Sequence, residues 1–251
     1  MSNPDIFEMQ WFLTAGETNA QGRMPITLVV SRAIEIATFH ANALGIGYSN
    51  LAEHRLGWVL ARLTIEMRRY PEINETYGMT TWIEGCNRFF SDRCFEMTDA
   101  QGKVIANIRS MWVAIDIDNR KMADLTKLRS ENFPITAKSC PVAKCSTPQI
   151  AQDAATECSE YTFAYCDLDF NRHVNTVRYI DKVLNLHSLD FHDKNKIERL
   201  EVSFDSECHF GDKVELRTGQ SRRDSHAETT EIITTAGRRA ISVELMYSAI
   251  D

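Results

Sequence analysis

The chain has no long apolar run, no surplus of positive charge and no closely spaced pair of cysteines. Its apolar runs fall well short of the ~18 residues that a membrane-spanning helix needs, so we expect no membrane span. The formal net charge of −7 argues against general nucleic-acid binding, which requires a basic surface. With 43% hydrophobic and 25% charged residues, the composition is that of a soluble globular protein.

None of the seven cysteines forms a C-x-x-C pair, which argues against a zinc ribbon or a thioredoxin-type site. Their odd number fits reduced thiols in a cytosolic protein. Residues 1–10 include Asp5 and Glu8 and lack the basic and apolar regions of a signal peptide. We therefore predict a cytoplasmic protein, and we expect neither a metal ion nor a cofactor.

Apolar residues recur at helical spacing over residues 26–44, directly after Pro25 and up to Gly45. This pattern predicts a long buried helix with a glycine stop. Alternating apolar segments over residues 58–117, with a turn at 99–102, predict about four antiparallel strands. We therefore expect the first half to be an antiparallel sheet wrapped on a helix.

A change of composition marks the middle of the chain. Residues 125–159 carry three of the six prolines and show weak periodicity, which favours a connector laid over a surface. We assign residues 1–125 to an N-terminal domain, 126–158 to the connector and 159–251 to a C-terminal domain.

The second half repeats the order of the first. Residues 63–75 align with residues 200–212 at one constant offset, and in each half a helix precedes this segment. We infer a duplicated domain. The two copies differ where Tyr70-Pro71 in the first is matched by Glu207-Cys208 in the second. This difference places the expected chemistry in the C-terminal half.

Asp169, Asn171 and His173 alternate along one stretch of the second half. If this stretch is extended, all three side chains face the same side, because strand side chains repeat every two residues. The comparable first-half segment, residues 19–23, has no histidine or acid. We therefore predict proton-transfer chemistry around His173. The alternative is a polar turn in which the aspartate and asparagine are local hydrogen bonders.

A helix is predicted to start directly after this stretch. Val177 and Ile180 begin an apolar pattern at helical spacing, with Asn175 or Thr176 as the N-cap. Backbone N–H groups near such a helix start can hold a developing oxyanion.

The run Asp169-Phe170-Asn171-Arg172-His173-Val174-Asn175, within the duplicated helix-and-sheet pattern, resembles the acyl-acyl carrier protein (acyl-ACP) thioesterases of plants and bacteria. Trp82, Ser110-Met111-Trp112-Val113 and Glu207-Cys208 are similar to further landmarks of that family, so the resemblance covers nearly the whole chain. It implies an α+β fold, a tandem (double) hotdog in which each half is a long helix wrapped by an antiparallel β-sheet. We expect the N-terminal half, which lacks the catalytic set, to be non-catalytic and to shape the acyl tunnel.

The resemblance implies hydrolysis of a fatty acyl thioester on the phosphopantetheine arm of acyl carrier protein. The products would be free fatty acid and holo-ACP, which is chain termination in fatty acid biosynthesis. The implied partner is acyl carrier protein, with the chain a monomer or homodimer. An acyl-CoA thioesterase is the closest alternative, because CoA carries the same arm. A hotdog hydratase or dehydratase, and a non-catalytic acyl-thioester sensor that binds DNA, are further alternatives, although the acidic N-terminus supplies no DNA-binding element.

The catalytic residues implied by the resemblance are Asp169, Asn171, His173, Glu207 and Cys208. In one scheme Glu207 and His173 activate a water molecule that attacks the carbonyl carbon. In the other, Cys208 attacks as the nucleophile, with His173 as base and Asn171 as orienter. Without a bulge, alternation lets only one of Glu207 and Cys208 face the site. The Glu207 charge also disfavours a neighbouring thiolate, so we favour the water route.

Overall fold

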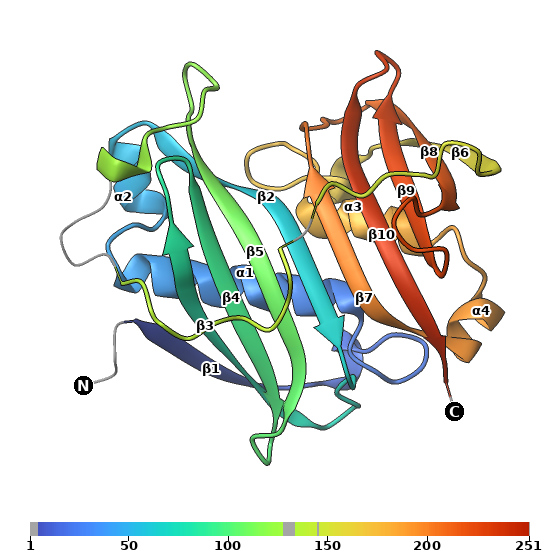
Figure 1. Ribbon diagram of the computed structural model, residues 1–251, viewed down its shortest axis with the longest axis horizontal. Helices are drawn as coiled ribbons and strands as arrows, with labels where there is room; N and C mark the ends of the chain where they lie inside the picture. The colour runs from blue at the N-terminus through green and yellow to red at the C-terminus, as the bar shows by residue number, and fades with distance from the viewer. Residues whose placement is uncertain (1–4, 128–133, 145, 251) are drawn as a thin grey trace. The chain divides into compact units, whose positions relative to one another are not determined.

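The computed structural model describes residues 5–127, 134–144 and 146–250. It divides the chain between Lys144 and Cys145 into two compact units, each with a helix packed on an antiparallel sheet (Figure 1). The division lies inside the segment 126–158 that the sequence assigns to a connector. No helix in the described residues combines the length and the apolar character needed to cross a membrane.

The first unit contains a sheet with the strand order β1-β3-β4-β5-β2, every neighbouring pair being antiparallel. Its elements in chain order are β1 (Ile6–Phe12), η1 (Ala15–Glu17), α1 (Ile26–Ala43), α2 (Tyr48–Glu53), β2 (Leu56–Met67), β3 (Thr76–Cys86), β4 (Phe90–Asp99), β5 (Val104–Asp116) and η2 (Leu125–Lys127). Strand β1 adds to the roughly four strands that the sequence predicts. The residues of β1 alternate only weakly between apolar and polar, so the sequence shows no clear strand pattern there. All of them are half-buried or exposed in the structure.

Helix α1 is the long helix that the sequence predicts. Pro25 is its N-cap residue, a position where the missing N–H of proline costs no helical hydrogen bond, and Gly45 follows its end with a positive φ of 71°. The side chains that it buries recur at spacings of three and four: Ile26, Val29, Val30, Ala33, Ile36, Ala37, His40 and Ala41. This face packs against β1 and β3, and Figure 1 shows α1 running along the sheet.

Part of the predicted connector is bound to the first unit. Residues 134–144 follow its surface, where the Trp82 indole N–H donates to the Lys138 carbonyl at 2.7 Å. The Arg109 Nε donates to the Val142 carbonyl at 2.7 Å. These bonds explain why the division lies at Lys144, because the segment's carbonyls complete the hydrogen bonding of buried first-unit side chains. Residues 128–133 of the predicted connector lie outside the described residues.

The second unit repeats the layout of the first. Its sheet has the order β7-β10-β9-β8-β6, again antiparallel throughout. The elements are β6 (Thr156–Thr162), η3 (Tyr165–Asp167), α3 (Thr176–Leu184), α4 (Leu189–Lys194), β7 (Asn195–Phe204), β8 (Lys213–Gln220), β9 (Ala227–Thr234) and β10 (Arg239–Ala249). Strand β6 begins three residues before position 159, where the sequence assigns the start of the C-terminal domain. Helix α3 is half as long as α1, because Ser188 starts a new helix, α4, as its N-cap.

In each unit an ion pair ties the 3-10 turn η1 or η3 to the helix that follows it, α1 or α3. In the second unit Lys182 Nζ lies 2.9 Å from Asp167 Oδ1. The other carboxylate oxygen accepts from the Tyr161 hydroxyl and the Ala164 N–H, each at 2.9 Å. In the first unit an Arg32–Glu17 pair at 2.6 Å occupies the corresponding place. The pair therefore belongs to the scaffold that both units share.

The second-unit pair predicts a pH-dependent stability. Burial, the largest single influence, raises the pKa of Asp167, but the bonds from Ala164, Lys182 and Tyr161 outweigh it, so the pKa is lowered overall. A lowered folded-state pKa gives stability that is present above the unfolded pKa of about 3.9 and is lost as the pH falls through the folded value. We expect Asp167→Asn to lower the free energy of unfolding by about 2 kcal/mol at pH 7, because it leaves Lys182 half-buried without its counter-charge.

Urea denaturation of wild type and Asp167→Asn at pH 7 and at pH 2.5, below the unfolded pKa, measures this effect. The difference between the two proteins should shrink at the lower pH. Asp190→Asn, at an exposed pair with Lys194, is the matched control and should change stability by less than about 0.5 kcal/mol. A difference for Asp167→Asn that is constant with pH would contradict the assignment.

Candidate active site

The stretch that carries the predicted site residues is a tight loop, so the prediction of an extended segment is wrong. This histidine loop, residues 168–175, connects η3 to α3 and turns through Arg172, whose φ is 64°. The Asp169 carboxylate oxygen Oδ1 accepts from the N–H groups of Asn171 at 2.8 Å and His173 at 3.0 Å. The Asp169 N–H donates to the His173 carbonyl at 2.8 Å. These bonds reverse the chain, which an alternating strand would not do.

The turn separates the three alternating side chains. The Asp169 carboxylate binds the backbone of its own loop, and Asn171 is exposed. Among the described residues, neither side chain forms a hydrogen bond or ion pair with the imidazole of His173. The alternative of a polar turn therefore describes this stretch: Asp169 is a local hydrogen bonder, and Asn171 lies exposed on the turn.

The first unit contains the same turn without a histidine. There Asn19 Oδ1 accepts from the N–H groups of Gln21 at 3.1 Å and Arg23 at 3.0 Å. Gly22, with φ of 70°, stands where the second unit has Arg172. An amide oxygen and a carboxylate oxygen thus form the same turn. The shape of the histidine loop needs an acceptor at its first position but no negative charge.

A second loop, residues 205–212, lies beside the histidine loop. We call it the glutamate loop. The Val174 N–H donates to the Cys208 carbonyl at 2.8 Å, and His173 and His209 form an isolated antiparallel bridge. The glutamate loop closes on itself where the His209 N–H donates to Asp212 Oδ2 at 2.8 Å. Backbone bonds therefore fix the two loops against each other.

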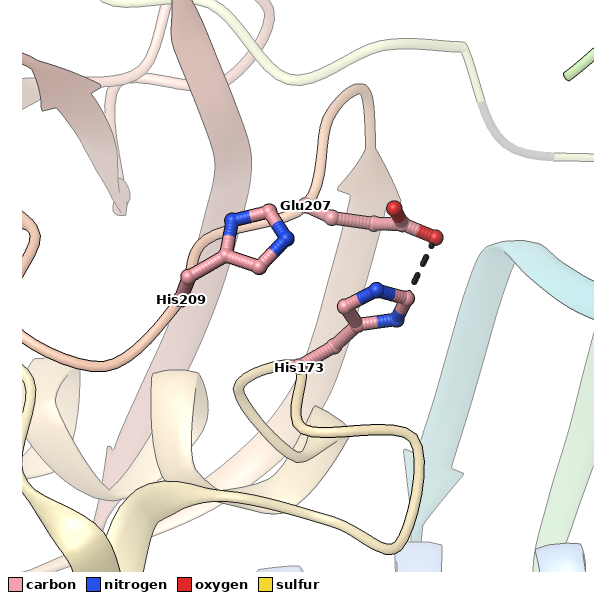
Figure 2. A group of neighbouring side chains, drawn as sticks. All are labelled: His173, Glu207 and His209. Atoms are coloured by element: carbon pink, nitrogen blue, oxygen red, sulfur yellow. Dashed lines mark ion pairs between the residues drawn. The ribbon is translucent and has the colours of Figure 1, made fainter.

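Glu207 and His209 of the glutamate loop meet His173 (Figure 2). His173 Nδ1 lies 3.5 Å from Glu207 Oε1, and the rings of His173 and His209 meet edge to face with centroids 5.1 Å apart. The structure thus brings together two of the five predicted residues. The sequence prediction missed His209, although it shares the alternation of Glu207, two residues earlier.

Cys208 lies between these two residues in the sequence but is fully buried. Its N–H donates to the Tyr179 hydroxyl of α3 at 2.9 Å. Burial raises the pKa of the Cys208 thiol, and the Tyr179 hydroxyl opposes this only in part. Burial likewise raises the pKa of Tyr179, so the phenol stays neutral. A thiolate at Cys208 is therefore disfavoured at neutral pH.

The start of α3 agrees with the prediction in one respect and corrects it in another. Asn175 is the N-cap, and its side chain accepts from the Val177 N–H at 3.1 Å, as expected. The Asn175 N–H, however, donates to the Asp167 carbonyl at 2.8 Å. Since that bond closes the loop, the Asn175 N–H is not available to an oxyanion, and an oxyanion role for the Thr176 N–H stays a prediction.

Two copies of a helix packed on an antiparallel sheet, of which the second carries a histidine–carboxylate cluster, define a tandem hotdog protein. Comparison with known proteins adds the family. Residues 4–131 match the acyl-ACP thioesterase N-terminal domain, and residues 150–249 match the acyl-ACP thioesterase C-terminal domain. The chain belongs to the acyl-ACP thioesterase family, as the resemblance of its motifs indicates.

Individual relatives share only about a quarter of their aligned residues with this chain. Over 215 residues the chain is 25% identical to the chloroplastic palmitoyl-acyl carrier protein thioesterase of Gossypium hirsutum. This match covers 81% of this chain and 52% of that protein. Over 228 residues it is 25% identical to the chloroplastic oleoyl-acyl carrier protein thioesterase of Coriandrum sativum, with 84% and 61% covered. The chain thus spans between half and two thirds of the length of these curated relatives.

Solved structures confirm the fold. An acyl-ACP thioesterase from Bacteroides thetaiotaomicron matches with a TM-score of 0.87 and 28% identity, covering 97% of this chain and 98% of that one. The 12:0-ACP thioesterase from Umbellularia californica matches with a TM-score of 0.86 and 19% identity, covering 100% and 99%. The predicted tandem hotdog is therefore confirmed.

The comparison of the two turns predicts how Asp169 tolerates substitution. Asp169→Asn keeps the acceptor that Asn19 provides in the first unit, so the free energy of unfolding should fall by less than about 0.5 kcal/mol. Asp169→Ala removes the acceptor of two N–H groups and should cost about 1.5 kcal/mol. Urea denaturation at pH 7 measures both values. Equal losses for the two variants would mean that the charge, and not the acceptor, stabilises the loop.

Proposed function

We propose that the protein hydrolyses the fatty acyl thioester of acyl carrier protein, releasing free fatty acid and holo-ACP. The observation that carries this proposal is the approach of His173 and Glu207 to 3.5 Å within the segment that matches the thioesterase C-terminal domain. The names of the curated relatives, which are acyl carrier protein thioesterases, support the same chemistry. Chain termination in fatty acid biosynthesis is the process in which this reaction belongs.

The proposed mechanism uses water as the nucleophile. Glu207 and His173 together accept a proton from a water molecule as its oxygen attacks the carbonyl carbon. The tetrahedral oxyanion is held by backbone N–H groups at the start of α3, with Thr176 as the first candidate. The carbon–sulfur bond then breaks, and the phosphopantetheine sulfur leaves as a thiolate that takes up the proton. A thiolate needs little help to leave, so this set of groups suffices.

The roles of the remaining predicted residues follow from their contacts. Asp169 is a positioning residue, because its carboxylate holds the His173 N–H and thereby the turn that presents the imidazole. Asn171 lies exposed on the same loop, where its amide is free to meet a bound substrate. Cys208 is proposed as a packing residue, because it is buried against Tyr179 and its raised pKa disfavours the thiolate.

The N-terminal half is proposed to shape the acyl tunnel without taking part in hydrolysis. In its copy of the two loops, Arg23 and Glu72 pair by a backbone bridge in the manner of His173 and His209. Tyr70, which stands in the position of Glu207, is a half-buried phenol, and desolvation raises its pKa. Neither the guanidinium of Arg23 nor the phenol of Tyr70 is suited to general-base catalysis at neutral pH.

Carrier protein is proposed over CoA because the chain belongs to the acyl-ACP thioesterases. The cytoplasmic location and the monomeric or homodimeric state stay predictions from the sequence, and the curated plant relatives are named as chloroplastic proteins.

Release of free fatty acid from a panel of acyl-ACP and acyl-CoA substrates tests the proposal. His173→Ala and Glu207→Gln should each lower kcat by about 100-fold or more, because each removes a proton acceptor. Cys208→Ala should keep kcat within about threefold of wild type, since its thiol takes no part. His226→Gln, an exposed histidine of the same unit, is the matched control and should behave as wild type.

Several results would count against this scheme. Loss of activity in Cys208→Ala, with an unchanged melting temperature, would favour the cysteine route. A product with a new or lost double bond in place of free acid would indicate a hydratase or dehydratase. Higher kcat/KM on acyl-CoA than on acyl-ACP would make CoA the carrier.

Alkylation gives an independent test of the Cys208 role. Iodoacetamide at pH 7.5 should label the exposed Cys166 well before the buried Cys208, and activity should not follow the labelling of Cys208. Peptide mass mapping alongside the hydrolysis assay measures both. Cys166→Ser is needed as a control, because Cys166 lies two residues before the histidine loop. Inactivation of Cys166→Ser in step with Cys208 labelling would restore the cysteine route.

A further inference from the structure

Three potential metal ligands converge at the site from two loops. His173, Glu207 and His209 each offer one ligand atom, and these atoms all lie within 4.8 Å of one another (Figure 2). Two imidazoles and one carboxylate form a donor set that suits zinc and related divalent transition ions. We propose that this triad binds a zinc-class divalent ion, and that the bound ion reversibly blocks hydrolysis by occupying His173 and Glu207.

The distances fit a zinc site after small side-chain movements. Zinc bonds of about 2.0–2.1 Å to nitrogen and oxygen place tetrahedral ligand atoms about 3.3 Å apart. His173 Nδ1 and Glu207 Oε1 are already 3.5 Å apart. The His209 side chain, at 55% exposure, can rotate the remaining distance without disturbing the core. Three protein ligands leave a fourth position for water.

The backbone holds the ligands ready. The bridge between His173 and His209 and the bond from the Val174 N–H to the Cys208 carbonyl fix the spacing of the two loops. Such fixed spacing lowers the entropy lost when the side chains close on an ion.

Asp212 supplies the outer contact that metal-binding histidines usually have. Its Oδ2 accepts from the backbone N–H of His209 at 2.8 Å and lies 3.7 Å from the ring nitrogen Nδ1, which a small rotation of the ring would bring within hydrogen-bond distance. A carboxylate on Nδ1 orients the ring and leaves Nε2 for the ion. The predicted absence of a metal rested on cysteine spacing, which does not report on histidines brought together by folding.

The first unit serves as an internal negative control. At the positions of His173, Glu207 and His209 it has Arg23, Tyr70 and Glu72, and the Arg23 guanidinium lies 4.0 Å from the Glu72 carboxylate. A cation in this place excludes a second one, because like charges repel. We therefore expect one such zinc site per chain.

Calorimetric titration of the chelator-treated full chain with zinc sulfate at pH 7.5 tests binding directly. Wild type should bind one equivalent of zinc. His209→Gln should raise the Kd for zinc at least tenfold, and Asp212→Asn should raise it about tenfold. His226→Gln should bind as wild type does. Millimolar magnesium should not compete, because magnesium prefers octahedral oxygen ligands.

Inhibition is tested with the same variants, and this part of the inference rests on the proposed function. Zinc should inhibit wild-type hydrolysis, and a chelator should restore it. Without zinc, His209→Gln should hydrolyse within about twofold of wild type, because His209 has no part in the proposed mechanism. It should need at least tenfold more zinc for half-inhibition.

Two kinds of result would overturn the inference. Binding that is absent, or that His209→Gln leaves unchanged, would indicate an adventitious ion only. Binding without inhibition, or with faster hydrolysis, would refute the blocking role. If wild type hydrolyses no thioester at all, the proposed function fails, and the calorimetric arm still decides the metal site by itself.

Discussion

The geometry of the site depends on one side-chain oxygen that accepts two backbone N–H groups. Asp169 Oδ1 draws in the N–H groups of Asn171 and His173, and this reverses the chain within five residues. The reversal forces Arg172 into a left-handed conformation that costs about 1 kcal/mol for a residue with a side chain. The ion pair of Asp167 and Lys182 anchors the loop where it begins, and the N-cap Asn175 anchors it where it ends.

The duplicated unit shows which of these features belong to the scaffold and which to the chemistry. The turn of the first unit, built on Asn19, repeats the hydrogen bonds of the histidine loop, and the Arg32–Glu17 pair repeats the anchor. What differs is the set of side chains that the two loops present. The same backbone that pairs His173 with His209 pairs Arg23 with Glu72 in the other copy. The first unit therefore forms the same pair of loops without the candidate catalytic side chains of the second.

The sequence predicted the features that rest on strong local physics and missed those that rest on tertiary contacts. Helix α1 followed from Pro25, Gly45 and the period of its apolar residues. The alternation of Asp169, Asn171 and His173 fitted a strand and a turn equally well, because both place polar residues at every second position. Aligned Gly22 in the first copy is the signal that would have found the turn, since glycine favours a positive φ. His209 carried no motif and became visible only when folding placed it beside His173.

Adjacent residues of a motif need not act together, and the glutamate loop shows why. Glu207 and His209 share one face by alternation, so Cys208 must point the other way, into the core against Tyr179. That orientation buries the thiol, and burial disfavours its charged form by raising its pKa. The same alternation that turns Cys208 away from His173 places His209 beside it. Burial of the Cys208 sulfur is the feature of this loop that supports the proposed water route, and the outward Glu207 and His209 are two of the three ligands of the proposed metal site.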